Sequence, residues 1–261
     1  MSESLTVLVV RPRTQALAWV GELGALGVAA RALPLIDILP APEPARVAAV
    51  LDEVAASSEE SVLVFVSPNA VHGFFDAGAR EARAWPAHAR AAATGPGTVA
   101  ALRECGVPGE CIVAPPADAA QFDSEALWTV VAAWPWAERP VWIVRGNGGR
   151  DWLWQQLRDA GAQVRVIQSY GRAAPALDAD ERALLAAALA EPAAWVWMFS
   201  SSEAVDNLRA LAPGADWSAA RALASHPRIA EAVEAAGFGV VRLVAPTAAA
   251  VAAAVAETPR H

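Results

Sequence analysis

The sequence contains little cysteine, histidine or basic charge, and each shortage excludes a class of protein. Its 261 residues include 2 cysteines and 4 histidines. The two cysteines, Cys105 and Cys111, are too few and wrongly spaced for a disulfide framework, a redox Cys-x-x-Cys pair or a zinc site. The chain has 20 Lys and Arg against 28 Asp and Glu, a net charge of −8. This balance argues against a nucleic-acid partner, because phosphate backbones select for clustered cations.

Long hydrophobic runs are also missing. The alanine-rich stretch at 247–256 is far shorter than the roughly 20 apolar residues that a membrane helix needs. The short apolar run at 5–10 is typical of a buried strand rather than a signal peptide. We therefore expect a cytoplasmic protein with no membrane partner. At 55% hydrophobic residues the chain can still bury a substantial core, enough for one large domain or two modest ones.

Along the chain, short Val-, Ile- and Trp-rich runs alternate with longer Ala- and Leu-rich stretches of helical spacing. This alternation is typical of repeated βα units around parallel sheets. The predicted strands are 6–10, 29–36, 62–66, 90–93, 111–114, 141–144, 163–167, 194–199, 221–224 and 240–244. The predicted helices are 14–26, 44–56, 69–79, 97–104, 123–133, 149–160, 178–190, 203–211, 227–236 and 247–255. This number of βα units is larger than one ordinary doubly wound sheet contains.

Comparison of the sequence with itself explains this excess. Matched segments follow strands in consistent cyclic order: 65–71 with 199–205, 93–100 with 224–230, 10–13 with 144–147, and 113–116 with 244–247. Such pairs indicate two similar βα lobes. Their order requires one lobe to be inserted in the other, so we predict lobe 1 at 1–37 plus 173–261 and lobe 2 at 40–168. The crossings at 35–40 and 168–175 would form a two-stranded linker able to act as a hinge.

Four motifs stand out among these segments: FVSPNAV at 65–71, its echo FSSSEAV at 199–205, the RGN turn at 145–147 with its following helix, and IQSYGR at 167–172. Together they resemble the uroporphyrinogen-III synthase family of tetrapyrrole biosynthesis. The resemblance spans essentially the whole chain. It implies two flavodoxin-like lobes joined by a β-ladder and no metal or organic cofactor. It also implies cyclisation of the linear tetrapyrrole hydroxymethylbilane with inversion of the last pyrrole ring, ring D.

One motif departs from the family pattern. The family's second lobe often carries a Gly-Pro-Thr-Thr-like turn, whereas this sequence has His226-Pro227-Arg228-Ile229. No hydroxyl contact can be transferred to that turn. Ser67 and Ser201 are the serines that match the family's Phe-Thr-Ser pattern.

The chemistry points to candidate residues. Hydroxymethylbilane closes spontaneously to the unrearranged isomer once its hydroxyl leaves, so a catalyst must chiefly hold the chain for attack at the substituted carbon of ring D. A general acid can assist departure of the hydroxyl, and Tyr170, the only tyrosine, is the candidate. Helix N-termini and arginines are expected to bind the substrate carboxylates. The predicted binding residues are Arg11, Ser67, Asn69, Thr94, Gly97, Thr98, Arg145, Gly146, Asn147, Ser200, Ser201 and His226.

Alternatives stay open at several of these positions. The turn RGNGGR at 145–150 is interpreted as an anion-facing helix N-terminus, but its glycines can equally serve only a tight turn. It lacks the full G-x-G-x-x-G spacing of a dinucleotide site. Tyr170 can be a half-buried linker residue, and His226 can simply cap a helix. A two-lobed binding protein for a small polyanion or tetrapyrrole, without catalysis, is the alternative function. Hinge closure around the substrate is consistent with a monomer.

Overall fold

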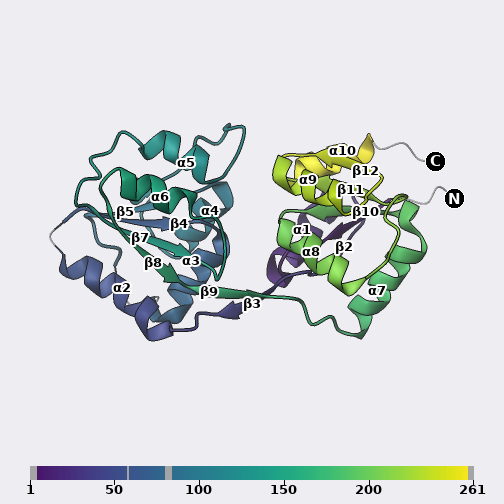
Figure 1. The fold of residues 1–261 in the computed structure, drawn as a ribbon, viewed down its shortest axis with the longest axis horizontal. Coiled ribbons are helices and arrows are strands. Elements are labelled where there is room, and N and C mark those ends of the chain that lie inside the picture. Colours follow the sequence, from purple (N-terminus) through teal and green to yellow (C-terminus); the bar gives the residue numbers. More distant parts are fainter. Residues whose placement is uncertain (1–4, 58, 80–83, 258–261) are drawn as a thin grey trace. The chain divides into compact units, whose positions relative to one another are not determined.

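The computed structural model of the chain describes residues 5–57, 59–79 and 84–257. It divides into two compact units. The first unit consists of Met1–Asp37 and Ala173–His261, and the second is the continuous segment Ile38–Arg172. Each unit contains one five-stranded parallel sheet (Figure 1). The predicted fold class, two parallel-sheet lobes with one inserted in the other, is confirmed.

The sheet of the first unit has the strand order β12-β11-β10-β1-β2. Its strands are β1 (Thr6–Val9), β2 (Ala30–Ala32), β10 (Trp195–Phe199), β11 (Arg221–Ala224) and β12 (Val240–Leu243), and all neighbours are parallel. Both faces are covered. Val7 and Val9 pack with α1 (Arg13–Ala25) and α10 (Ala248–Ala256), whereas Leu8 faces α7 (Ala179–Ala190), α8 (Ser202–Leu211) and α9 (Pro227–Ala235). Burial on both faces explains the continuous apolar run of β1.

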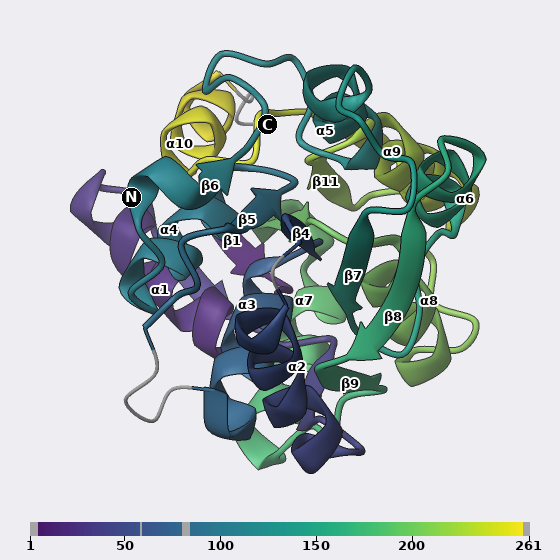
Figure 2. The same cartoon turned by 90° about the vertical axis from the view of Figure 1, so that its left-hand side faces the viewer.

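The sheet of the second unit has the order β6-β5-β4-β7-β8. Its strands are β4 (Ser61–Phe65), β5 (Ala89–Ala93), β6 (Ile112–Val113), β7 (Pro140–Arg145) and β8 (Gln163–Gln168), again all parallel. One face packs against α2 (Pro44–Ala56), α3 (Pro68–Phe74) and α4 (Pro96–Glu104). The other packs against α5 (Ser124–Val131) and α6 (Trp152–Asp159). Figure 2 shows these two helical layers on opposite sides of the sheet.

The two sheets have the same order when they are read from edge to edge. This reading matches β12 with β6, β11 with β5, β10 with β4, β1 with β7 and β2 with β8. The segments paired in the sequence comparison follow matched strands, so the predicted internal repeat is confirmed. At the two points where the chain passes from one unit to the other, β3 (Asp37–Pro40) and β9 (Tyr170–Ala173) pair as a separate two-stranded sheet.

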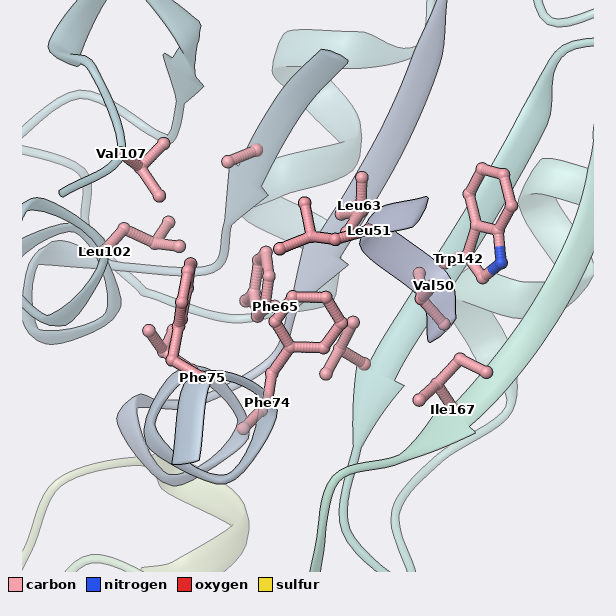
Figure 3. Close-up of a cluster of buried hydrophobic side chains, with 14 of the residues drawn as sticks. Val50, Leu51, Leu63, Phe65, Phe74, Phe75, Leu102, Val107, Trp142 and Ile167 are labelled. Atoms are coloured by element: carbon pink, nitrogen blue, oxygen red, sulfur yellow. The ribbon is translucent and has the colours of Figure 1, made fainter. Parts of the chain in front are cut away.

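An aromatic core supports the end of β4 in the second unit. The rings of Phe65 and Phe74 lie edge to face with centroids 5.4 Å apart, and Phe74 meets Phe75 at the same distance. Figure 3 shows this cluster between β4, α3 and the side chains of Trp142 and Ile167. Burial of one such ring stabilises the fold by about 1.5–3 kcal/mol. The core therefore fixes the backbone from which Ser67, two residues beyond β4, projects.

Three elements differ most from their predicted extent. The helix predicted at 149–160 begins only at Trp152, because Gly149 has a φ of 123°, outside the right-handed helical region. The helix predicted at 69–79 is observed as α3 followed by a π-helical turn, Phe75–Ala79. The strand predicted at 29–36 is observed only as β2. Strand pairing with β1 ends at Ala32, although the Leu33 N–H still donates to the Val9 carbonyl oxygen at 3.1 Å, and Leu33 and Leu35 are fully buried. Two short 3₁₀ helices, Gly109–Cys111 and Pro192–Ala194, complete the secondary structure of the described residues.

Candidate active site

The predicted site residues follow the carboxyl ends of the parallel strands in their own unit. Because parallel strands end at one edge of a sheet, loops after different strands come together there. The second unit contributes Ser67, Asn69, Thr94, Gly97, Thr98, Arg145, Gly146 and Asn147, and the first unit contributes Arg11, Ser200, Ser201 and His226. Tyr170 opens β9 and belongs to the second unit.

The structure joins Tyr170 to Ser67 by a hydrogen bond. The Tyr170 Oη lies 3.3 Å from the Ser67 Oγ, and the Arg172 Nη2 donates to the same Oη at 2.8 Å. Tyr170 is only 1% exposed, so its ring belongs to the core of the second unit. The alternative interpretation is a half-buried tyrosine on the linker strand; Tyr170 does lie on that strand, β9, but it is fully buried.

Ser67 caps the helix that begins beside Tyr170. Its Oγ accepts a hydrogen bond from the Ala70 N–H at 3.1 Å, and Pro68 occupies the first turn of α3. An N-cap serine and a proline at the start of the helix are the expected entry to a helix. Ser67 is half-buried, so it stands between the core and the solvent.

A second contact holds α3 against the segment that carries Tyr170. The buried Ser169 Oγ donates to the Ala70 carbonyl oxygen at 2.9 Å. Gly73, one helical turn further on, approaches so closely that a Cβ atom there would lie 2.2 Å from the Ser169 carbonyl oxygen. Only glycine fits this approach, and it keeps the Ser67 and Tyr170 hydroxyls within reach of each other.

The glycine turn after β7 supports Tyr170 rather than opening a helix. A Cβ atom on Gly146 would lie 2.7 Å from the Tyr170 Cζ, so the missing side chain makes room for the phenol ring. Asn147 binds the backbone of Arg172 twice: its Oδ1 accepts from the N–H at 2.7 Å and its Nδ2 donates to the carbonyl at 3.0 Å. Because α6 starts at Trp152, the prediction that Gly146 begins a helix N-terminus is wrong.

The two arginines of this turn have acidic neighbours. The Arg145 Nη1 donates to Asp151 Oδ1 at 2.8 Å. Arg150 forms an ion pair with Glu125, and the hydrogen bonds that Arg150 donates to this carboxylate raise the pKa of Arg150 above its ordinary value. A carboxylate ligand of Arg145 would therefore have to share the guanidinium with Asp151.

The remaining predicted residues of the second unit differ in exposure. Thr94 is 7% exposed and its Oγ1 donates to the Val66 carbonyl at 3.2 Å, whereas Thr98 is 3% exposed. Asn69 is half-buried in the first turn of α3, and Gly97 is exposed in the first turn of α4. The backbone around Gly97 and the side chain of Asn69 are thus more accessible to a ligand than the two threonines.

Arg11 and Ser200 form the polar centre of the first unit. The Arg11 Nε donates to the Ser200 Oγ at 3.2 Å, and the guanidinium carbon lies 4.3 Å from the centre of the Trp19 ring. Burial lowers the pKa of Arg11 to about 10, an effect that nearby Glu22 partly opposes. Arg11 is therefore still a cation at neutral pH, although it has lost part of its hydration. A partly desolvated cation of this kind is suited to bind a carboxylate.

His226 and Ser201 begin the helices of the first unit. The His226 Nδ1 accepts from the Arg228 N–H at 3.2 Å, so His226 caps α9, as its alternative interpretation proposed. Ser201 occupies the N-cap of α8, the position that matches Ser67 in the repeat. Within the described residues, the Ser201 side chain makes no capping hydrogen bond.

Sequence reasoning missed Arg172, Ser169 and Gly73. Arg172 follows Tyr170 by two positions on a strand, and such residues point to the same face, so this signal was available in the sequence. Ser169 and Gly73 carried no such signal, because their contact joins segments that are distant in the chain.

These features define an α/β protein of two similar doubly wound units, with arginines, hydroxyls and a buried tyrosine near the strand ends. Residues 18–253 match the family model described as uroporphyrinogen-III synthase HemD. The chain belongs to the uroporphyrinogen-III synthase family, whose members are cyclising enzymes of tetrapyrrole biosynthesis.

Curated relatives and solved structures agree with this family. The uroporphyrinogen-III synthase of Salmonella typhimurium strain LT2 is 32% identical over 180 residues, which cover 69% of this chain and 70% of the relative. The Escherichia coli K12 enzyme is 31% identical over the same coverage. A mutant synthase from the extremely thermophilic bacterium Thermus thermophilus shares the fold with a TM-score of 0.57, at 18% identity over 91% of this chain and 92% of that chain. The Helicobacter pylori 26695 enzyme has a TM-score of 0.60, at 14% identity over 97% and 98%.

Metal-binding clusters and membrane-spanning helices are absent from the part of the chain that the structure describes. No group of three or more His, Cys, Asp or Glu side chains among them is arranged to hold a metal ion. None of the helices they form is both long and apolar enough to cross a bilayer.

Proposed function

We propose that this chain cyclises hydroxymethylbilane to uroporphyrinogen III, with loss of water and inversion of ring D. The observation that carries the proposal is membership of the synthase family across residues 18–253, which contain the whole second unit and most of the first. Family members act on hydroxymethylbilane.

Substrate positioning accounts for most of the catalysis in this proposal. The substrate carries carboxylate side chains and closes by itself to the wrong isomer, so the enzyme must favour attack through the substituted carbon of ring D. Arg11, with its Ser200 partner, is the proposed anchor in the first unit, because a carboxylate would replace the hydration that it has lost. Arg145 and the first turns of α3 and α4 supply further donors in the second unit.

Departure of the substrate hydroxyl is the step that benefits from an acid. Loss of hydroxide gives an azafulvene-like cation, which ring D attacks to form a spiro intermediate before cleavage and closure invert that ring. Tyr170 is the proposed source of the proton, and its hydrogen bond to Ser67 supports this role. In this proposal the enzyme is a cytoplasmic monomer that needs no metal or organic cofactor. Its net charge of −8 supports a small-molecule rather than a nucleic-acid partner.

Analysis of the product isomers tests the function. The purified protein is mixed with freshly generated hydroxymethylbilane, the products are oxidised, and type I and type III porphyrins are separated by chromatography. We expect predominantly type III at catalytic protein concentration without added metal or cofactor. Heat-denatured protein is the control for spontaneous closure. If only type I forms at the spontaneous rate, the enzymatic proposal is wrong and a polyanion-binding protein remains.

A further inference from the structure

We infer that Tyr170 acts through Ser67: Arg172 fixes the direction of the hydrogen bonds, and the Ser67 hydroxyl is the group that donates to the leaving hydroxyl of the substrate. This inference rests on the proposed function and adds to it. It makes Ser67 the catalytic residue, and Tyr170 and Arg172 its positioning residues.

The direction of the chain of hydrogen bonds follows from the chemistry of arginine. A guanidinium has only donors, so the Arg172 Nη2 must donate to the Tyr170 Oη across 2.8 Å. The phenol proton must then point elsewhere. Among the described residues, the Ser67 Oγ at 3.3 Å is the acceptor that contacts it. A buried hydroxyl donor is costly to leave unpaired, so Tyr170 donates to Ser67.

Ser67 then has a proton to give. Its Oγ accepts from the Ala70 N–H at 3.1 Å and from Tyr170, which uses both lone pairs. The hydroxyl hydrogen of Ser67 must therefore point away from both donors. Because Ser67 is half-buried and Tyr170 is 1% exposed, only the serine can offer its proton to a bound substrate without rearrangement of the core.

The surrounding contacts keep this geometry in place. Asn147 holds the backbone of Arg172 through two hydrogen bonds, and Ser169 ties the neighbouring segment to α3. Gly146 leaves the space that the phenol ring fills. The hydroxyl groups of Ser67 and Tyr170 and the guanidinium of Arg172 are thus aligned before the substrate arrives, as preorganised catalysis requires.

The proton transfer balances without a further reactant. The Ser67 proton passes to the departing oxygen, and the electron pair of the C–O bond leaves with that oxygen as water. The pyrrole nitrogen supplies the electrons for the new exocyclic double bond. Tyr170 reprotonates Ser67, and Arg172 stabilises the resulting phenolate. The proton released when the macrocycle recovers its aromatic pyrroles returns to Tyr170 through Ser67.

A double-mutant cycle tests the inference with the full-length protein. The variants are Ser67→Ala, Tyr170→Phe and the double variant, and kcat for type III formation is measured above the spontaneous background. We expect losses of about 100-fold for Ser67→Ala and about tenfold for Tyr170→Phe. The double variant should lose no more than Ser67→Ala alone, because Tyr170 has no route to the substrate without Ser67. A double loss near the product of the single losses would overturn the inference.

Ser201 provides the matched control, since it occupies the equivalent N-cap in the first unit. Combining Ser201→Ala with Tyr170→Phe should multiply their separate losses. Thermal melting identifies folding defects, and Ser67→Thr, which keeps a hydroxyl at the N-cap, should recover most of the kcat. If Ser67→Ala does not fold, Ser67→Gly takes its place in the cycle.

Arg172 is tested by the split between kcat and KM. Arg172→Met should lower kcat about as much as Tyr170→Phe and leave KM unchanged, and Arg172→Lys should recover part of the loss. An increase in KM with unchanged kcat would show instead that Arg172 binds a substrate carboxylate. Formation of type III by the native protein separates the two proposals: if it forms and the cycle shows no coupling, only the relay is wrong.

Discussion

At the scale of single residues, the site depends on small side chains as much as on reactive ones. Tyr170 and Ser67 carry the proposed chemistry, but their separation of 3.3 Å exists because Gly146 and Gly73 allow other groups to approach. The sequence motif RGNGGR at 145–150 is interpreted from the sequence as an anion-facing helix N-terminus. In the structure the first glycine of that motif packs against the phenol ring, and Asn147 binds the backbone of β9.

Gly146 and Gly148 distinguish these two roles of the turn. Gly146→Ala would force the Tyr170 ring to move, so we expect a loss of about 1–3 kcal/mol in the free energy of unfolding and a lower kcat. Gly148 is exposed, and a Cβ atom there would meet nothing within 4 Å, so Gly148→Ala should change neither quantity appreciably. Denaturant unfolding and type III kinetics measure both effects. If the two variants lose affinity for the substrate equally, the turn binds anions and the steric role is wrong.

At the scale of helices and strands, the sequence predicts most of the fold. The apolar runs of β1 and β4 are continuous because both faces are buried, which makes them recognisable without an alignment. The sequence also predicts the starts of α3 and α10, where Ser67 and Thr247 cap the first turn. The start of α6 was missed, since nothing in the letters shows that Gly149 adopts a positive φ. The contact between Tyr170 and Ser67 was missed because these residues lie about a hundred positions apart in sequence.

The position of α3 relative to Tyr170 yields a prediction about this helix. Gly73→Ala would place a Cβ atom 2.2 Å from the Ser169 carbonyl oxygen, which cannot move without disturbing β9. We expect a loss of about 1–3 kcal/mol in stability and a reduced kcat, because Ser67 moves with α3. The control is Gly24→Ala in α1, where a Cβ atom meets nothing within 4 Å. That helical substitution should stabilise the protein by about 0.5–1 kcal/mol. Equal melting shifts for the two variants would contradict the proposed close approach.

At the scale of the whole molecule, the two units share a fold but differ in the side chains at their strand ends. Both sheets have the same strand order, yet their strand ends differ: the first unit presents Arg11 with Ser200, and the second presents Ser67 with Tyr170 and Arg172. The first unit therefore presents a partly buried cation, and the second presents a chain of hydrogen-bonded hydroxyl groups.

The insertion of one unit in the other predicts how the molecule can be divided. The segment Ile38–Arg172 is continuous and has a core on each face of its own sheet, so we expect it to fold alone when it is produced separately. Far-UV circular dichroism and a cooperative thermal transition would show this, with tryptophan fluorescence as a second probe, since Trp85, Trp136 and Trp142 of this segment are buried.

The isolated second unit should nevertheless form no type III product, because it lacks Arg11 and the other proposed binding groups of the first unit. It would still contain the hydrogen-bonded chain from Arg172 to Ser67. Product isomer analysis at high protein concentration provides the measurement, with the full-length protein as the positive control. Type III formation by the isolated unit would mean that the first unit contributes nothing essential. An unfolded fragment would instead show that the two units depend on each other for stability, despite their separate cores.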